Sequence, residues 1–281
     1  MDPRDRPQAS RGAAAMMPRA ARLGRRIGRG LRKAAGAVDS LVYPSSCTAC
    51  LRRPIDRNHL CTPCQVELLR LVSLPFCPRC GQTVGPNVPG CGDEGCGACP
   101  GTFPRFARVH RLGPYTGPIR RAVRELKYRR RDTLVGYLCG LLGRLIERDG
   151  EDVRLVLPVP MYWSRRLLRG QDHSRRLAGA LASHLGLVLG DDLVRKRDTP
   201  PQVHLPRSRR LQNVRGAFDV RNPAAVDGES VLLVDDVTTT GATADEAART
   251  LLRAGASRVE LAVLGKSEPP TAYGAYLTSQ G

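Results

Sequence analysis

The sequence predicts an α/β fold, with a parallel sheet flanked by helices and a small cysteine-rich module before it. Residues 231–234 are four consecutive apolar residues, which is typical of a strand buried on both faces of a parallel sheet. Residues 244–254 strongly favour a helix, and Gly255 ends it. Eight of the ten cysteines form four Cys-x-x-Cys pairs ahead of this core.

The other elements are predicted from apolar spacing and from turn residues along the chain. Strands or extended stretches are expected at residues 107–112, 153–159, 187–189 and 258–264. Helices are expected at residues 118–128, 133–147 and 174–184. Residues 195–215 are rich in charge and proline and lack periodicity, so they are predicted to form a mobile loop over the site.

Two adjacent carboxylates, Asp235 and Asp236, come where the apolar strand should end. The backbone N–H groups of the next loop and the helix dipole favour an anion, and Gly241 allows close approach. The carboxylates can accept hydrogen bonds from ribose hydroxyls and can help to hold Mg²⁺. A sugar-phosphate site is therefore predicted, and an acidic strand end with a solvated turn is the alternative. The loop residues of the predicted sugar-phosphate site are Thr238, Thr239, Thr240, Gly241, Ala242 and Thr243.

The paired cysteines have the spacing of two structural zinc sites, each formed by four thiolates. The expected ligands are Cys47, Cys50, Cys61 and Cys64, followed by Cys77, Cys80, Cys96 and Cys99. Disulfides and redox pairs are the alternatives. Cys91 could replace Cys96 or Cys99 in the second site, and Cys139 is expected to be a core residue in an apolar helix.

The formal charge is +19, and nearly all the positive charge is arginine. This balance favours nucleic acid, anionic lipid or phosphorylated substrates, although an arginine-rich compositional habit of the source genome explains it as well. No apolar run approaches the ~20 residues of a membrane span, and no signal peptide is apparent, so a cytoplasmic protein is expected. The expected organisation is a disordered basic tail (1–40), a zinc-binding module (41–100), an α/β domain (101–266) and a flexible tail (267–281).

Residues 231–243 resemble the phosphoribosyl-pyrophosphate (PRPP) motif of type I phosphoribosyltransferases. With the cysteine pairs, the chain resembles the ComF family, the competence-associated branch of that superfamily, over about residues 41–266. The resemblance implies a type I phosphoribosyltransferase-like sheet with a double zinc ribbon before it. It also implies functional roles for Lys127 of a Leu-Lys-Tyr signature, for Arg197 of the flexible catalytic loop, and for a pyrophosphate loop with Arg165, Arg169 and Gly170.

The chain departs from the family at Gln171-Asp172-His173, where many members have an aromatic-Asn-Gln run. This departure leaves the acceptor site unassigned, and His173 is expected to be a capping or surface residue rather than a catalyst.

The resemblance implies transfer of a ribose 5-phosphate unit from PRPP with Mg²⁺, in which Asp235 and Asp236 would steady the ribose ring. Such a protein would serve DNA uptake in natural transformation or nucleotide salvage. The alternative is a non-catalytic adaptor that binds single-stranded DNA beside a competence helicase. Whether the chain is an enzyme stays open at this point.

Overall fold

The computed structural model describes residues 46–53, 55, 59–85, 91, 95–97, 99, 104–128, 132–149, 152–162, 172–199 and 207–269. All of them belong to one compact unit, Ser46–Gly281. The expected tail at residues 1–40 and most of the expected tail at 267–281 lie outside the described residues. Among the described helices, none has both the length and the apolar character needed to cross a membrane.

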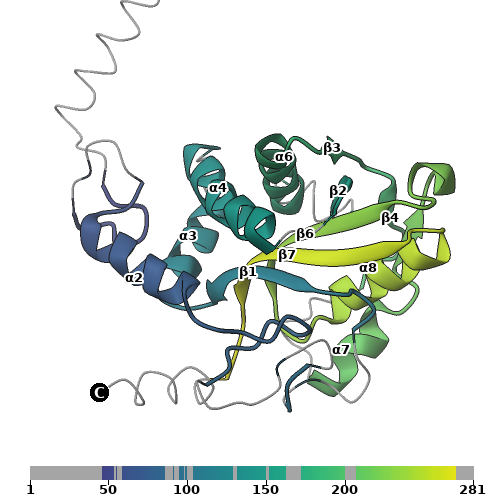
Figure 1. The fold of residues 1–281 in the computed structure, drawn as a ribbon, viewed down its shortest axis with the longest axis horizontal. Coiled ribbons are helices and arrows are strands. Elements are labelled where there is room, and N and C mark those ends of the chain that lie inside the picture. The colour runs from purple at the N-terminus through teal and green to yellow at the C-terminus, as the bar shows by residue number, and fades with distance from the viewer. Residues whose placement is uncertain are drawn as a thin grey trace, which may run out of the picture. The chain divides into compact units, whose positions relative to one another are not determined.

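Five parallel strands form the main sheet, in the order β1-β7-β6-β2-β3 (Figure 1). Their bounds are β1 (Val109–Pro114), β2 (Leu155–Pro158), β3 (Val188–Leu189), β6 (Ser230–Thr238) and β7 (Arg258–Lys266). Every pairing in this sheet is parallel. The predicted fold class, a parallel sheet flanked by helices, is confirmed.

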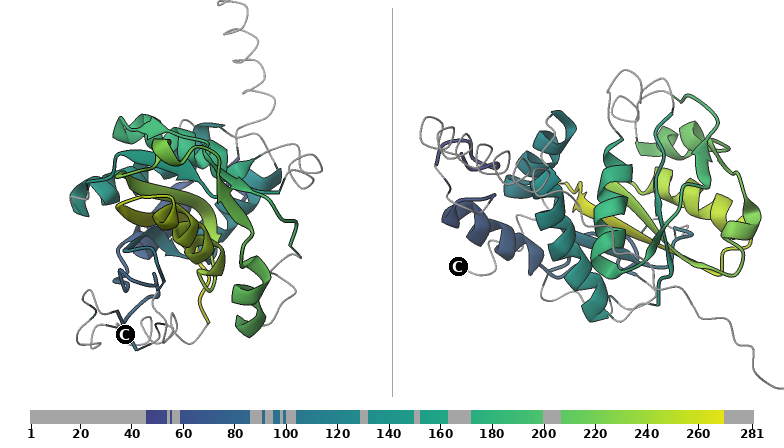
Figure 2. Two further views of the ribbon diagram at one scale, coloured as in Figure 1. Left: turned by 90° about the vertical axis from the view of Figure 1, so that its right-hand side faces the viewer. Right: turned by 90° about the horizontal axis from the view of Figure 1, so that it is seen from above.

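The apolar run in β6 is explained by two cores, one on each face of the sheet. Leu232 and Val234 belong to the core that holds α3 (Gly117–Tyr128), α4 (Asp132–Asp149) and α6 (His173–Leu185). Val231 and Leu233 alternate with them and belong to the core under α8 (Ala242–Arg253). The views in Figures 1 and 2 show α4 and α6 on one side of the sheet and α8 on the other.

The cysteine-rich segment contributes one helix, α2 (Thr62–Val72), to the first of these cores. Leu68 and Leu71 of α2 are buried in the same cluster as Leu112 of β1 and Ile119 of α3. The segment therefore packs on the sheet domain through ordinary apolar side chains as well as containing its cysteines.

The segment 195–215, predicted to be a mobile loop, contains regular structure over its described residues. β4 (Leu193–Arg195) pairs antiparallel with β5 (Phe218–Val220), and α7 (Arg207–Val214) lies between them in the sequence. A short 3₁₀ helix (Pro223–Ala225) follows β5. The prediction that the segment lacks regular structure was therefore wrong for residues 207–214, where a short and highly charged helix gives too few apolar positions for a visible period, although Val214 is fully buried. Residues 200–206 of the predicted loop lie outside the described residues.

A buried ionic cluster joins β1, β7 and the end of α4. The Nε2 atom of His110 lies 2.8 Å from Oε2 of Glu260, and its Nδ1 atom lies 3.5 Å from Oδ2 of Asp149. Burial of the ring opposes its charge, but hydrogen bonds to Asp149 and then Glu260 outweigh that effect, so the pKa of His110 is raised. The hydrogen bond from His110, acting against burial, lowers the pKa of Asp149.

This cluster predicts a pH dependence of stability. A histidine whose pKa is raised by folding stabilises the fold fully below its unfolded pKa of about 6.5, and the contribution is lost as pH rises through the higher folded value. We therefore expect thermal unfolding of the unmutated protein to lose a component of stability above about pH 6.5 that His110→Gln lacks. The same substitution at the exposed His184, His184→Gln, is the control. If the unfolding temperature of His110→Gln depends on pH in the same way as that of the unmutated protein, the prediction is contradicted.

Candidate functional site

The direction in which the chain winds across the sheet reverses between β2 and β6. From β2 the chain runs through α6 to β3 on one side, and from β6 it runs through α8 to β7 on the other. Ligands of open parallel sheets bind at the carboxyl ends of strands at such a reversal. Pairing of β2 with β6 ends at Pro158 and Val234, whereas pairing of β6 with β7 continues to Thr238.

Asp235 and Asp236 lie in this extension of β6, beyond the end of β2. The strand was predicted to end at the carboxylates, but it continues to Thr238, because β7 continues to pair with the backbone on one side. On the other side the backbone has passed the last residue of β2, which leaves both carboxylates at the carboxyl edge of the sheet.

The two carboxylates have different environments. Oδ1 of Asp235 accepts hydrogen bonds from Ser174 Oγ at 2.9 Å and from the N–H of Asp236 at 2.8 Å. Burial, together with the negative charge of Asp236, raises the pKa of Asp235 to about 7. Oδ2 of Asp236 instead lies 2.7 Å from Nζ of Lys127.

Lys127 reaches the pair from the last turn of α3. Burial acts against its charge, but Asp236 and then Asp235 outweigh burial and raise the pKa of Lys127. Three of the four predicted catalytic residues are thus brought together from two separate elements, which the sequence positions alone could not reveal.

The predicted phosphate loop follows β6 directly. Gly241 has a φ of +81° and begins α8, a conformation that glycine adopts without strain. The N–H of Ala242 donates to Thr240 Oγ1 at 3.4 Å. Nη1 of Arg210, in α7, donates to Thr239 Oγ1 at 3.0 Å. Thr238 is buried at the end of the strand.

Lys266 is a site residue that the sequence reasoning missed. It ends β7 opposite Thr238, is only 6% exposed, and donates through Nζ to the backbone oxygen of Thr239. The sequence did contain a signal that could have pointed to Lys266: lysine is rare in this chain, with only four among its many arginines. Two of them, Lys127 and Lys266, reach this site.

The remaining predicted residues do not all join the site. Nη1 of Arg197 donates to the backbone oxygen of Arg215 at 2.8 Å, at the end of α7. Arg165, Arg169 and Gly170 lie outside the described residues.

His173 was expected to be a cap or a surface residue, and that expectation was wrong. His173 is buried, and the carboxylate of Asp172 caps α6 by accepting from the N–H of Arg175 at 3.0 Å. His173 lines a small cavity together with Lys127 and Asp236.

The predicted zinc ligands gather into two tetrads, and all eight cysteines have free thiols. The first tetrad is Cys47, Cys50, Cys61 and Cys64, and the second is Cys77, Cys80, Cys96 and Cys99. Four thiolates placed tetrahedrally at ~2.3 Å from one ion lie about 3.8 Å apart. The sulfur pairs at 3.8 Å in the first tetrad and at 3.7, 3.7 and 3.9 Å in the second fit that spacing.

The tetrads bear on two alternatives left open by the sequence, disulfides and the place of Cys91. Sulfurs this far apart are not in disulfides. The second tetrad contains both Cys96 and Cys99, and Cys91 lies beside it, within hydrogen-bond reach of Cys77 and Cys96. Cys139 is buried in α4, where its thiol lies 3.5 Å from the backbone oxygen of Leu177.

Two family models match the chain. The phosphoribosyl transferase domain matches residues 171–270, and the double zinc ribbon domain matches residues 38–100. The DNA utilization protein YhgH of Salmonella typhi is 34% identical over 230 residues, which cover 79% of this chain and 96% of that protein. Competence protein F of Haemophilus influenzae is 26% identical over 215 residues, covering 74% and 90%. The chain belongs to the ComF family.

Membership of the ComF family confirms the resemblance seen in the sequence, and the double zinc ribbon with its two tetrads supports about two structural zinc ions. Among solved structures, the glutamine PRPP amidotransferase from B. subtilis is similar, with 21% identity and a TM-score of 0.35 over 50% of this chain and 30% of that chain. A likeness of this size adds nothing to the fold described above.

Proposed function

We propose that this ComF protein binds PRPP with Mg²⁺ at the carboxyl edge of β6. The observation that supports the proposal is the convergence of Asp235, Asp236 and Lys127 on one end of the loop formed by Thr239–Gly241, which begins α8. A sugar with vicinal hydroxyls and a phosphate matches this arrangement. The carboxylates can accept hydrogen bonds from the hydroxyls, and the N–H groups of the loop that follows can donate to the phosphate.

Each group has a proposed task. The loop N–H groups and the start of α8 would hold the 5-phosphate, and Arg210 lies within reach of the same loop through Thr239. Asp235 and Asp236 would accept hydrogen bonds from the ribose hydroxyls, and Lys127, whose Nζ lies 2.7 Å from Oδ2 of Asp236, would hold that carboxylate in position. When bound, Mg²⁺ would supply charge that stabilises the pyrophosphate group.

As an enzyme, the protein would transfer the ribose 5-phosphate unit of PRPP to an acceptor. The bond between the anomeric carbon and the pyrophosphate oxygen would break, and pyrophosphate would leave. The carboxylates beside the ring would stabilise the positive charge that develops on the ribose. Titration calorimetry with PRPP and Mg²⁺ tests the binding, with ribose 5-phosphate as the comparison ligand. Isotope exchange between pyrophosphate and PRPP separates an enzyme from a binding protein, and absence of PRPP binding would overturn the proposal.

A second candidate function is binding of single-stranded DNA, in uptake or utilization of DNA beside a helicase. The formal charge of +19 and the double zinc ribbon support it, as do the names of the relatives, a DNA utilization protein and a competence protein. The chain has only 4% aromatic residues to stack on bases.

Deleting residues 1–40 gives a direct test, because this segment is rich in arginine and contains none of the site residues. Each phosphate neutralised on a single strand adds about −0.7 to the slope of log K against log salt. If DNA binding is a function of the folded protein, the truncated chain should retain measurable but less salt-dependent affinity for an oligonucleotide. Loss of all binding would mean that the tail charge alone caused it.

A further inference from the structure

Arg79 lies between two ligands of the second tetrad, Cys77 and Cys80, and its side chain leaves the zinc ribbon. Nη1 donates to the backbone oxygens of Ala107 at 2.7 Å and Phe106 at 3.4 Å, and Nη2 donates to that of Pro104 at 3.3 Å. A planar guanidinium can hold several acceptors in one fixed arrangement. The side chain of Arg79, which lies between two ligands of the second tetrad, thus fixes the backbone of residues 104–107.

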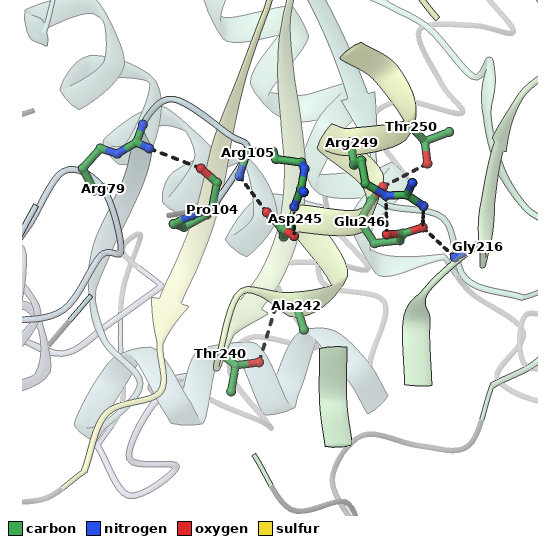
Figure 3. A network of polar contacts seen from close by, with 10 residues as sticks. All are labelled: Arg79, Pro104, Arg105, Gly216, Thr240, Ala242, Asp245, Glu246, Arg249 and Thr250. Atoms are coloured by element: carbon green, nitrogen blue, oxygen red, sulfur yellow. Dashed lines mark hydrogen bonds and ion pairs between the residues drawn. The ribbon is translucent and has the colours of Figure 1, made fainter. Parts of the chain in front are cut away.

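The segment that Arg79 holds contacts the beginning of α8. The N–H of Arg105 donates to Asp245 Oδ1 at 2.6 Å, and its guanidinium lies 3.2 Å from Asp245 Oδ2 (Figure 3). The N–H of Asp245 in turn donates to the backbone oxygen of Gly241 at 2.8 Å. The buried ring of Phe106 lies against Gly241, where a Cβ atom would be 3.4 Å from Cζ.

A second route joins the same tetrad to the same loop. Gly81 follows the ligand Cys80, and a Cβ atom placed on it would lie 3.1 Å from Val109 Cγ1 and 3.8 Å from Lys266 Cδ. Lys266 donates to the backbone oxygen of Thr239. The two routes therefore end at the two ends of the loop, Thr239 and Gly241.

The neighbouring carboxylate, Glu246, contacts a different part of the chain. Its Oε1 accepts from the N–H of Gly216 at 2.6 Å, and its Oε2 accepts from Arg249 Nε at 2.8 Å (Figure 3). Asp245 and Glu246 thus tie the first turns of α8 to two separate segments. Of these two carboxylates, Asp245 is the one whose contact leads back to the zinc ribbon.

We propose that the second zinc site positions the phosphate loop, with Arg79 as the positioning residue that connects them. The inference builds on the proposed binding of PRPP at that loop. Donors already held in their bound arrangement cost less entropy on binding, and a short loop that ends in a glycine has little rigidity of its own. The first tetrad has a different place, since Cys47, Cys61 and Cys64 belong to the apolar core with α3 and α4.

The test compares Arg79→Ala with Arg52→Ala, an exposed arginine beside the first tetrad. Zinc content is measured first, so that both variants are compared with about two ions bound. We expect Arg79→Ala to weaken PRPP·Mg²⁺ binding about tenfold, and to speed hydrogen exchange of the amides at 239–245 in the unliganded protein. Arg52→Ala should change neither, and Arg79→Lys should restore part of both.

Asp245→Asn provides a second variant that leaves the zinc ribbon intact, for the case in which Arg79→Ala loses zinc. Because Arg79 and Asp245 act through one segment, their combined effect should be smaller than the sum of the two. Exchange at 239–245 and PRPP affinity that match Arg52→Ala in both variants would overturn the proposal. If the unmutated protein does not bind PRPP, the proposed function fails, and the exchange rates alone decide whether Arg79 positions the loop.

Discussion

Replacing Cys47 with serine should leave a protein that is largely insoluble, while the unmutated protein purifies with about two zinc ions per chain. Structural zinc contributes an apparent ~10–16 kcal/mol in small zinc domains, which is as large as the net stability of about 5–15 kcal/mol of a whole domain. Cys47 is fully buried in the first tetrad, so the loss of one ligand also leaves three thiols in the core without their ion.

Cys139→Ser is the matched control for this experiment. Cys139 is as buried as Cys47 but belongs to neither tetrad, and a serine hydroxyl can still donate to the backbone oxygen of Leu177. Metal analysis and thermal unfolding should show two zinc ions and a modest loss of stability. A well-folded unmutated protein that contains iron, or no metal, would contradict the assignment.

The variant in which both Asp235 and Asp236 are replaced by asparagine should bind PRPP·Mg²⁺ at least tenfold more weakly. Hydrogen bonds to charged groups contribute about 1.5–3 kcal/mol each, and two such acceptors face the proposed ribose position. Calorimetry measures the loss. Asp191→Asn, an exposed carboxylate in the loop between β3 and β4, is the control and should bind as the unmutated protein does. Unchanged PRPP affinity in the double variant would contradict the site.

The single variant Asp235→Asn should be more stable than the unmutated protein when no ligand is present. Since folding raises the pKa of Asp235 to about 7, the fold favours the neutral acid, and stability from this group falls as pH rises from about 4 through 7. Asparagine removes that cost, so the unfolding temperature at pH 8 should rise by at least about 2–4 °C. A residue that destabilises the fold and is needed for binding is a common feature of functional sites.

The parts of the site that the sequence predicted are those carried by contiguous residues. The strand, the carboxylates and the loop of residues 231–243 are one stretch, and the cysteine pairs have a spacing that is itself the signal. Lys266, in contrast, reaches the loop only because β7 lies beside β6 in register. Pairing of strands is set by the whole sheet, and no local pattern contains it.

Two errors have a similar physical origin. His173 was predicted to be a capping or surface residue from the usual places of histidine, but its ring is buried at the start of α6, where it lines a small cavity with Lys127 of α3. The end of β6 was placed too early because aspartate disfavours strands, whereas the ladder to β7 is made by backbone groups that any residue supplies. In both cases tertiary packing overrode the local preference of a residue.

The strand order has a consequence for how the chain folds. β1 is the first strand to be made, and its only partner in the described sheet is β7, the last one. On the ribosome about 150 more residues must therefore be made after β1 before it can pair in the sheet. A ribosome-bound chain that stops short of residue 258 leaves the backbone N–H and C=O groups along β1 without their partners in β7, and an unpaired strand edge of this kind is prone to aggregation.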